Sequence, residues 1–522
     1  MSNNDIIGRL YKPYVSDFLS EVRTVIELAD GKIENLEYIK PYWSALELSI
    51  QEKYPQWVKD GILYAAIREW LVQKGPQDII VLNDKLEITG VNYENIKKYI
   101  VWKYAPIYFK RTCYIYVDGF YVENANVLQN EIKRIIEEEW DDVNKRRING
   151  VVEEVMKRIE WERTISGNEY PFNWTKGSLI PFVNGVYWVD YDVLLPHSPY
   201  WLFSYKIPWE FNRDATCPHI EQFFSEIVEP EDVPLLYEFP ALAIMQEPGY
   251  ARAYMLVGSG SNGKSTYLNL IIKLLGEENV AKVSLQDINT KRFAPAELVG
   301  KLANIFPDLP THSLTSTSIF KALTGNDAIY VEKKFKDPFS FRFSGRLAFS
   351  TNQPPQVDDD SFAFWRRWAL IEFPNKFSEN PDLLQQLIPE IPGLINKIID
   401  HIKKIKREGL TKTKRIEEIM NKWRSMSDSV YFFIQKRVVP SPNSEVAKDE
   451  VYNEYVAFCE ENDIKPVIKN IFGMKIQQFL KVETVQRRVG GRRKRFYRGI
   501  KLIRDEDVDE HGTAQLMLNM IK

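Results

Sequence analysis

The sequence predicts an α/β fold of several domains, and three observations support this prediction. The chain has 522 residues, of which 44% are hydrophobic and 27% charged, enough for two to four globular domains. Residues 246–380 alternate apolar strand-like runs with helical patterns, as a parallel sheet covered by helices requires. Between one such strand and the helix after it lies a glycine-rich run, from Gly258 to Thr266. The sequence therefore indicates an α/β core with other domains on both sides.

Two regions precede this core. Residues 1–110 are predicted to be a helical N-terminal region, with amphipathic stretches at Val15–Leu28 and Trp57–Val72. Residues 111–245 are predicted to form a mixed α+β domain. Its expected elements are a strand over Cys113–Tyr121, helices over Val127–Trp140 and Val151–Trp161, and a hairpin of Leu179–Val183 and Val186–Val189 that turns at Asn184-Gly185.

The run GSGSNGKST has the spacing of a phosphate-binding loop, G-x-x-x-x-G-K-S. Glycines tolerate positive φ, so backbone N–H groups can surround a phosphate, and the N-terminus of the following helix, predicted over Lys264–Leu275 and ended by Gly276, adds partial positive charge. The residues predicted to bind the nucleotide are Gly258, Ser259, Gly260, Ser261, Asn262, Gly263, Lys264, Ser265 and Thr266. A chance glycine-rich turn is the weaker interpretation, because a strand precedes the run and an amphipathic helix follows it.

The chemistry expected at this loop follows from the same residues. Lys264 should reach the β- and γ-phosphates, and the Ser265 hydroxyl should hold Mg²⁺, so ATP and Mg²⁺ are the predicted cofactors. Two later strands of the core end in polar residues: Leu302–Phe306 is followed by Pro307-Asp308, and Leu347–Thr351 by Asn352. Because the carboxyl ends of parallel strands share one edge, we expect Asp308 beside the Mg²⁺ and Asn352 orienting the attacking water.

Two further features of the core carry cations. A hairpin predicted over residues 328–343 has Lys333, Lys334 and Phe335 at its tip, a combination that suits a single nucleic-acid strand, although a solvated hairpin end has the same composition. Before the strand predicted over Ala369–Phe373 stand Arg366 and Arg367, and one of them could reach the nucleotide of a neighbouring subunit as a catalytic residue. Either could instead pack against Trp365 or Trp368.

A helical segment over residues 381–428 leads to a C-terminal region, 429–522, that is predicted to be a winged-helix-like DNA-binding domain. Its signature is a helix over Ile471–Leu480 followed by a basic hairpin that turns at Gly490-Gly491. From Thr484 to Arg504 there are nine basic residues and no acid, although the whole chain has a net charge of −3. The predicted phosphate contacts are Arg487, Arg488, Arg492, Arg493, Lys494 and Arg495. A solvated charge run or a nuclear-import tract is the alternative.

Composition excludes several other classes of protein. The three cysteines, Cys113, Cys217 and Cys459, lie too far apart for a C-x-x-C site, and the five histidines show no metal-ligand spacing. No signal-peptide layout and no apolar run of about eighteen residues occurs. We therefore expect a soluble protein without a membrane partner, located in the cytoplasm of a host cell.

The ordered motifs resemble those of the superfamily 3 helicases, in particular the C-terminal region of phage, plasmid and poxvirus primase-helicases. The resemblance covers residues 111–375 and rests on GSGSNGKS, KRFAPAELVGKLANI, LTGND with VEKKFKDPFSF, AFSTNQPP and FWRRWALIEFP. It implies an AAA+-like core, a homo-oligomeric and hexameric ring, and ATP-driven movement along single-stranded DNA. Relatives usually carry a second acid beside the Walker B aspartate; here Pro307 precedes Asp308, which leaves the catalytic base open.

The expected function is that of a replicative DNA helicase of a virus, phage or plasmid, with single-stranded and duplex DNA as partners. Residues 1–110 are too short for a primase domain and show no paired-carboxylate motif, so a primase or polymerase would be a separate partner. An origin-binding initiator that melts DNA with ATP as a switch is the first alternative. A metabolite kinase with the same phosphate-binding loop is the second, and the paired arginines and the basic C-terminus argue against it.

Overall fold

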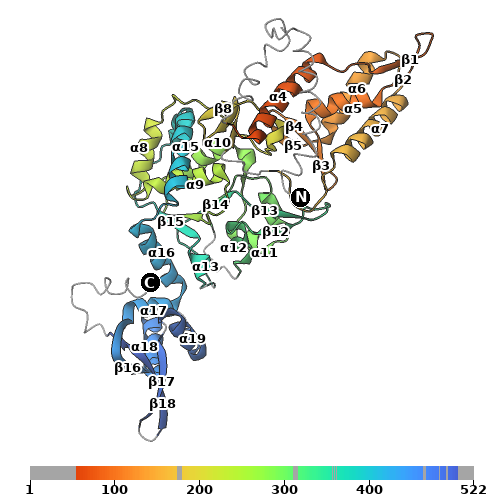
Figure 1. Cartoon of the computed structure of the whole chain (residues 1–522). Coiled ribbons are helices and arrows are strands. Elements are labelled where there is room, and N and C mark those ends of the chain that lie inside the picture. Colours follow the sequence, from red (N-terminus) through yellow and green to blue (C-terminus); the bar gives the residue numbers. More distant parts are fainter. Residues whose placement is uncertain are drawn as a thin grey trace.

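The computed structural model describes residues 54–172, 179–309, 316–355, 357, 359, 361–462, 466–480, 482–489 and 492–503. An N-terminal lobe, a central lobe and a C-terminal module follow one another along an elongated molecule (Figure 1). The helix expected over Val15–Leu28 and the turn expected at Gly490-Gly491 lie outside the described residues. The α/β class is confirmed, since a parallel sheet with helices forms the central lobe.

The N-terminal lobe begins with helix α4 (Gln56–Lys74), which contains the helix expected over Trp57–Val72. After it come the hairpin β1 (Ile80–Leu82) and β2 (Ile88–Val91), helix α5 (Tyr93–Tyr104), the strands β3 (Ile107–Phe109), β4 (Thr112–Val117) and β5 (Phe120–Glu123), and helices α6 (Ala125–Glu139) and α7 (Lys145–Arg163). Residues of α5, α6 and α7 such as Ile100, Ile132 and Val155 share a hydrophobic core.

Two expectations for this lobe need correction. The single strand expected over Cys113–Tyr121 is a hairpin of β4 and β5, because Asp118 and Gly119 have φ of 50° and 95° and turn the chain. The division expected at residue 110 falls between β3 and β4, which pair antiparallel with Tyr108 opposite Cys113. The helical region and the mixed domain therefore share one sheet.

A second small sheet connects this lobe to the central one. As predicted, β6 (Leu179–Phe182) and β7 (Gly185–Trp188) form a hairpin at Asn184-Gly185, and β8 (Val193–Leu195) pairs with β7. The chain then passes through a short 3-10 turn and two helices, α8 (Pro218–Ile227) and α9 (Val233–Met245). Helix α9 packs on the central sheet, and its Leu236, Ala241 and Leu242 are fully buried.

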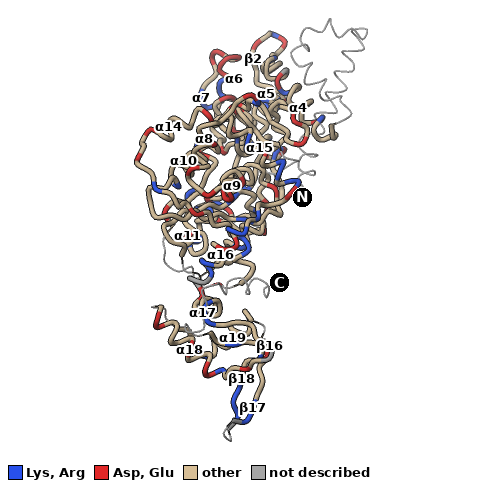
Figure 2. The backbone as a smooth tube through the Cα atoms, turned by 90° about the vertical axis from the view of Figure 1, so that its left-hand side faces the viewer, with Lys and Arg blue, Asp and Glu red and all other residues tan. Residues whose placement is uncertain are grey.

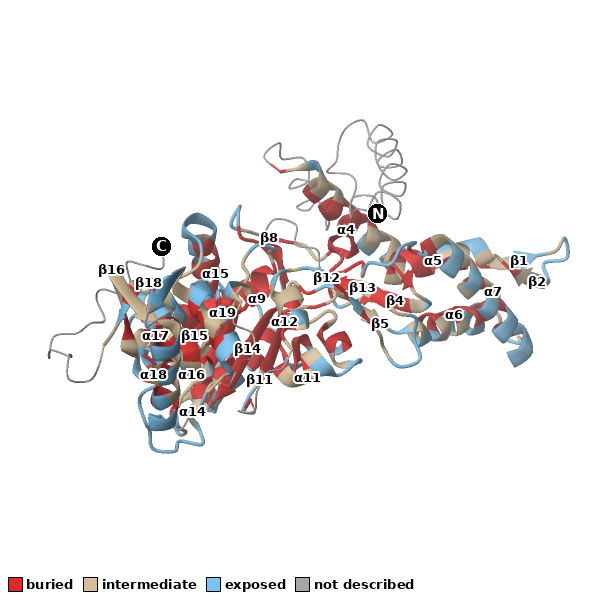
Figure 3. Cartoon of the chain, turned by 90° about the horizontal axis from the view of Figure 1, so that it is seen from below, coloured by how far each residue is buried: buried red, intermediate tan, exposed pale blue. Residues whose placement is uncertain are grey.

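The central sheet has five parallel strands in the order β10-β11-β14-β9-β15. The strands are β9 (Ala253–Val257), β10 (Val280–Ala281), β11 (Ala303–Phe306), β14 (Arg346–Thr351) and β15 (Trp368–Glu372), and the helices between them are α10 (Lys264–Leu275), α11 (Leu285–Thr290), α12 (Ser318–Thr324) and α13 (Phe362–Trp365). The strands form the buried centre of this lobe (Figure 3), as their apolar sequences predict for a parallel sheet. This order places β9 between β14 and β15, with β11 on the far side of β14.

The predicted hairpin within the core is β12 (Ala328–Val331) paired with β13 (Phe339–Arg342). It is anchored on the N-terminal lobe rather than standing alone: the Tyr170 amide donates to the Ser340 carbonyl at 3.1 Å, and the Phe339 ring lies 5.7 Å from that of Phe109. The hairpin therefore joins the two lobes.

The segment after the sheet forms α14 (Leu383–Leu387), α15 (Ile391–Glu408) and α16 (Lys414–Ser427). The C-terminal module then consists of α17 (Ser429–Arg437), β16 (Val438–Ala447), α18 (Lys448–Glu461), α19 (Lys469–Leu480), β17 (Glu483–Val489) and β18 (Arg492–Leu502). Its sheet has the order β16-β18-β17, and Phe433, Tyr455 and Phe472 belong to a core of its own. Among the described helices, none is long and apolar enough to cross a membrane.

Candidate nucleotide site

The loop between β9 and α10 has the geometry of a phosphate cradle. Gly263 has φ of 87°, and a Cβ there would lie 2.6 Å from Cγ2 of Ile227. A Cβ on Gly258 would lie 2.9 Å from the Phe373 carbonyl and closer still to the Asn262 amide. Only glycine fits these two positions, so the backbone N–H groups stay open. Helix α10 begins at Lys264 and ends before Gly276, as the sequence predicts.

Lys264 is held across the mouth of this loop. Its Nζ donates to the Gly258 carbonyl at 2.7 Å and to Oδ1 of Asn262 at 2.8 Å. The side chain of Lys264 is buried, and burial lowers the pKa of its amine, while the nearby Asp308 carboxylate opposes that shift. A desolvated ammonium with only neutral oxygens as hydrogen-bond partners favours an anionic ligand.

Asp308 and Asn352 come to the same edge of the sheet as Lys264. Strand β14 lies between β9 and β11, so the residues that follow these three adjacent strands meet at their carboxyl ends. Asp308 is exposed with φ of 57°, and its amide lies 3.3 Å from Oγ of Ser350 on β14. Asn352 is exposed one residue beyond the end of β14. The predicted grouping of Lys264, Asp308 and Asn352 is thus observed.

These residues line one cleft of about 1190 Å³. Residues 260–266 of the loop, with Ser265 and Thr266 at the helix start, form one side of it together with Pro307, Asp308 and Asn352. Gly258 and Ser259, which follow the end of β9, are not among the described lining residues. The volume is ample for a nucleoside triphosphate, which is comparable in size to a drug-sized ligand.

The opposite wall of the cleft was not predicted. It consists of one face of α8 and of the segment 377–387, and its residues include Gln222, Phe223, Glu226, Ile227, Phe377, Glu379, Gln386 and Leu387. The Phe377 amide donates to the Ser261 carbonyl at 2.8 Å, and Nδ2 of Asn375 donates to the Glu226 carbonyl at 2.8 Å. These bonds close the wall over the loop. No motif in the sequence predicts that α8 or this segment lines the cleft, because they reach it only through tertiary packing.

The paired arginines differ from each other, and neither is among the described residues that line the cleft. Arg367 is 8% exposed, and its Nη1 donates to the Ala363 carbonyl of the preceding helix α13. Burial lowers the pKa of Arg367, and the positive charge of Arg366 lowers it further. Arg366 is exposed at the surface. Of the two, Arg366 is the side chain that another molecule can reach.

The residues at the tip of the β12–β13 hairpin also differ in how far they are exposed. Phe335 is 94% exposed with φ of 63°, and Nζ of Lys334 lies 5.1 Å from the centre of its ring. Lys333 is half-buried, and burial lowers the pKa of its amine. Lys336 forms an ion pair with Glu123 on the N-terminal lobe. Lys334 and Phe335 are therefore the predicted residues that project into solvent.

The basic hairpin of the C-terminal module places like charges opposite one another. Arg488 pairs with Arg493 across the strands, and Arg487 pairs with Lys494. Arg487 has a carboxylate partner, since its Nε lies 2.7 Å from Oε2 of Glu445. Opposed cations destabilise a strand pair unless an anion is bound. Arg488, Arg493, Lys494 and Arg495 are exposed, and the end of the hairpin is dense with cations (Figure 2); the side chain of Arg492 lies outside the described ones.

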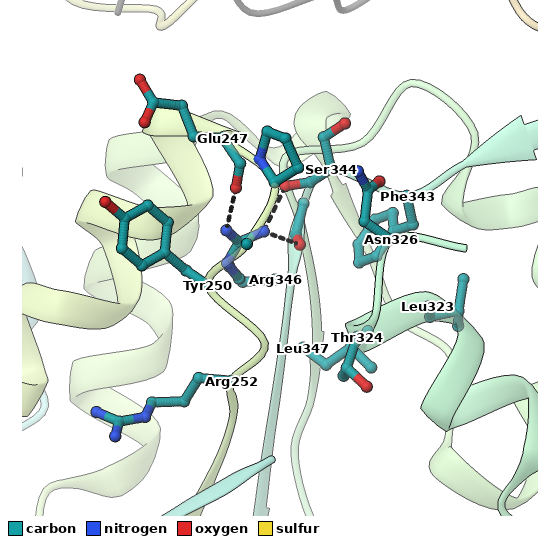
Figure 4. Close-up of a pocket in the computed structure, with 13 residues that line it drawn as sticks. Glu247, Tyr250, Arg252, Leu323, Thr324, Asn326, Phe343, Ser344, Arg346 and Leu347 are labelled. Carbon is teal, nitrogen blue, oxygen red and sulfur yellow. Dashed lines mark hydrogen bonds between the residues drawn. The ribbon is translucent and has the colours of Figure 1, made fainter. Parts of the chain in front are cut away.

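A second pocket, at the other end of the same sheet, holds Arg346 (Figure 4). Its guanidinium donates to the carbonyls of Ser344, Gly345 and Glu247 at 2.6, 2.8 and 2.9 Å. Burial lowers the pKa of Arg346 to about 10. The pocket has a volume of about 10 Å³, which is room for one water molecule. It is therefore a structural site and not a second ligand site.

Three known families match parts of this chain. A family described as "D5 N terminal like" matches residues 80–229. A family of unknown function, DUF5906, matches residues 256–367, which include the cradle and both arginines. The family described as "RFX DNA-binding domain" matches residues 428–504, the C-terminal module.

Two viral proteins are similar in sequence. A putative helicase, L207/L206, of Acanthamoeba polyphaga mimivirus is 22% identical over 332 residues, which are 57% of this chain and 34% of that protein. The putative primase C962R of African swine fever virus (strain Badajoz 1971 Vero-adapted) is 22% identical over 245 residues, 41% of this chain and 26% of that protein. The chain is related to the viral primase-helicase family. It spans about a third or less of the length of these relatives.

Among solved structures, the apo A form of the NrS-1 C terminal region aligns over 77% of the present chain and 98% of its own. The sequence identity is 13% and the TM-score 0.43.

Proposed function

We propose that this chain is an ATP-hydrolysing DNA helicase that acts in the replication of a virus, phage or plasmid. One observation carries the proposal: Lys264, Asp308 and Asn352 follow three adjacent parallel strands and line a single cleft. The strand order, with the cradle strand β9 between β14 and β15, supports an AAA+-like ATPase core. The relationship to viral primase-helicases supports DNA replication as the setting.

The residues of the cleft fit ATP and Mg²⁺. Gly258 and Gly263 leave no room for side chains, so a phosphate can approach the backbone N–H groups at the start of α10. Lys264 would exchange the Gly258 carbonyl and the Asn262 amide oxygen for the β- and γ-phosphate oxygens. Ser265 and Asp308 would hold Mg²⁺, whose charge neutralises the phosphates when it is bound.

Asn352 and Asp308 would prepare the water for attack. An amide at the end of β14 can accept and donate one hydrogen bond each, so Asn352 can fix both the position and the orientation of a water molecule. Pro307 supplies no carboxylate. Asp308, exposed at the sheet edge with its φ of 57°, would therefore both bind the metal and polarise the water.

We propose further that the active form is a homo-oligomeric ring, with a hexamer as the expected size. The cleft receives no guanidinium from Arg366 or Arg367 of its own chain. The exposed Arg366 would contact the γ-phosphate bound by a neighbouring subunit, a role that in comparable enzymes is worth about 10³- to 10⁵-fold in rate. Arg367 would support its backbone from inside, through its bond to Ala363.

Two surfaces would contact DNA. Lys334 and Phe335 project from the β12–β13 tip, where a cation and an aromatic ring suit one strand in a central channel. The C-terminal module has the element order of a winged helix, with α19 before the hairpin β17–β18, and its match to the RFX DNA-binding domain family supports binding to duplex DNA. The exposed cations of that hairpin, Arg488, Arg493, Lys494 and Arg495, would neutralise phosphates.

Strand displacement on a forked substrate tests the proposal. The wild-type chain should hydrolyse ATP, hydrolyse it faster with single-stranded DNA, and displace the annealed strand; Lys264→Ala should do none of these. An ATP-switched initiator remains the second candidate, favoured by the separately folded basic module. It would bind and melt duplex DNA in ATP without displacing a strand. ATP hydrolysis at a rate that DNA does not change would contradict both the helicase and the initiator.

A further inference from the structure

Helix α16 lies between the central sheet and the C-terminal module (Figure 1). Its buried residues Ile416, Ile419 and Trp423 recur at helical spacing and are 7%, 7% and 1% exposed. This face packs on β15, while the end of the helix leads directly into α17. Helix α16 is thus the one continuous element that links the nucleotide sheet to the C-terminal module in the described structure.

The first contact of α16 leads to the phosphate cradle. Nη2 of Arg415 lies 3.0 Å from Oε2 of Glu372, the last residue of β15. The next residue, Phe373, accepts a hydrogen bond at 3.2 Å from Nδ2 of Asn262. The amide oxygen of Asn262 in turn holds Lys264 at 2.8 Å. A chain of polar contacts therefore runs from the phosphate-binding lysine to α16.

Arg415 is fixed on its other side by a buried carboxylate. Its Nε lies 2.8 Å from Oδ2 of Asp232, whose side chain is fully buried at the start of α9. An ion pair with one fully buried partner resists separation, because the buried charge left behind would be uncompensated. Arg415 is thus held in place by Asp232, and a shift of Glu372 would act on α16 through its ion pair with Arg415.

The second contact of α16 leads to the loop that carries Asn352. Nε1 of Trp423 donates to the Pro355 carbonyl at 2.9 Å, three residues after Asn352. The same indole packs edge-on against Trp365, with ring centres 5.0 Å apart, and Trp365 directly precedes Arg366. One side chain therefore touches both the loop of the proposed water-positioning amide and the element of the proposed trans-acting arginine.

The far end of α16 is fastened to the C-terminal module. The Arg424 guanidinium lies over the rings of Tyr431 on α17 and Phe479 on α19, at 4.6 and 5.3 Å. Asp428 caps α17 and also pairs with Lys475 of α19 at 2.8 Å. A rotation or shift of α16 must therefore move α19 and the hairpin that follows it.

We propose that Arg415 and Trp423 are positioning residues that couple the nucleotide state of the cleft to the DNA-binding module through α16. The proposal rests on the function proposed above. A change at the Asn352 loop or at the cradle is transmitted by these two contacts, and DNA held by the module acts back on ATP turnover through the same contacts. Because coupling between two binding sites is reciprocal, the affinity for duplex DNA must differ between the ATP and ADP states.

The test compares two tryptophans of one cluster. Trp423→Phe removes the bond to Pro355, whereas Trp368→Phe makes the same chemical change at an indole whose buried N–H has no hydrogen-bond partner in the described structure. We measure the ratio of duplex dissociation constants in ADP and in a non-hydrolysable ATP analogue. In the wild-type protein, the duplex dissociation constants in the two nucleotides should differ by about fivefold or more, in either direction. Trp423→Phe should bring the ratio close to one, and Trp368→Phe should retain it.

Glu372→Gln provides a second variant that leaves the buried pair of Asp232 and Arg415 intact. Its matched control is Glu408→Gln, an exposed partner of Arg407 on α15. Glu372→Gln should reduce the ratio and Glu408→Gln should not. A wild-type chain that hydrolyses ATP but shows a ratio of one, or variants that all keep the wild-type ratio, would overturn the coupling while leaving the ATPase intact. Absence of ATP binding in wild type would instead overturn the proposed function itself.

Discussion

Both ends of the central sheet carry polar residues, but they use them in opposite ways. At the carboxyl end, Lys264, Asp308 and Asn352 open into a cleft of about 1190 Å³. At the amino end, Arg346 is enclosed by three carbonyl oxygens beside a cavity of about 10 Å³. The difference teaches that a buried cation indicates a ligand site where it lines a cleft large enough for an anion, and a structural role where carbonyl oxygens enclose it and no such cleft adjoins it.

The largest effect expected from this comparison is at Lys264. Lys264→Ala should lower ATP hydrolysis by at least about 10²-fold, because in the proposed function this ammonium neutralises the transferring phosphate oxygens. Stability should not fall, since burial already disfavours the charged amine. Steady-state hydrolysis and thermal unfolding measure the two properties. A variant that unfolds at a lower temperature than wild type and hydrolyses ATP at the wild-type rate would show that Lys264 has a structural role instead.

Arg346 should show the reverse behaviour. Arg346→Met removes three charge-assisted hydrogen bonds to buried carbonyls and should cost about 3 kcal/mol of unfolding free energy. Nucleotide affinity, measured by titration at a temperature where the variant is folded, should stay unchanged. The matched control is Arg342→Met, which loses the half-exposed pair with Glu169 and should cost less than about 1 kcal/mol. Equal losses of unfolding free energy in the two variants would contradict the structural role of Arg346 at the amino end of the sheet.

Much of the cleft was predictable because its signals are local. The cradle, the start of α10 at Lys264 and its end before Gly276 follow from short-range spacing, and the grouping with Asp308 and Asn352 follows from parallel-strand geometry. The turn at Asp118-Gly119 was also present in the sequence as a hairpin signal, although a single strand was expected there.

The remaining features depend on packing that no local pattern encodes. The α8 wall comes from a helix that precedes the loop by more than thirty residues and carries no nucleotide-binding motif. Which arginine points inward is decided by the bond of Arg367 to Ala363 and by burial. The link from α16 to the Asn352 loop depends on a single hydrogen bond from Trp423 to Pro355.

Asp359 extends the comparison to an acid beside the core. Burial raises the pKa of its carboxyl, but hydrogen bonds from Lys321, Ser361 and Thr317 outweigh burial and bring that pKa to about 2. Because the folded pKa lies below the unfolded value near 3.8, the stabilisation is complete above about pH 4 and is lost as the pH falls towards 2.

Asp359→Asn should therefore cost roughly 2 kcal/mol at pH 6. The difference from wild type should vanish near pH 2. Urea unfolding followed by tryptophan fluorescence between pH 2 and 6 measures it. A difference that stays constant over this range would show that the carboxylate charge is not what stabilises this contact.

The smallest effect is expected on DNA binding by the basic hairpin, where the exposed Lys494 lies opposite Arg487, which has a carboxylate partner. Lys494→Gln should weaken duplex binding uniformly across sequences and reduce the slope of log affinity against log salt by about one. Arg487→Gln should change the slope less, because Arg487 already pairs with Glu445. Fluorescence anisotropy at several salt concentrations measures both slopes. A larger change of slope for Arg487→Gln than for Lys494→Gln would show that Arg487, and not Lys494, is the cation that contacts phosphate.

The most direct test of the central claim is single-turnover ATP hydrolysis by Asn352→Ala alongside nucleotide binding. The account predicts that ATP and Mg²⁺ still bind within a few-fold of wild-type affinity while the hydrolysis step slows by about 10²-fold, because the amide orients water and does not hold the phosphates. Hydrolysis at the wild-type rate in this variant would contradict the account.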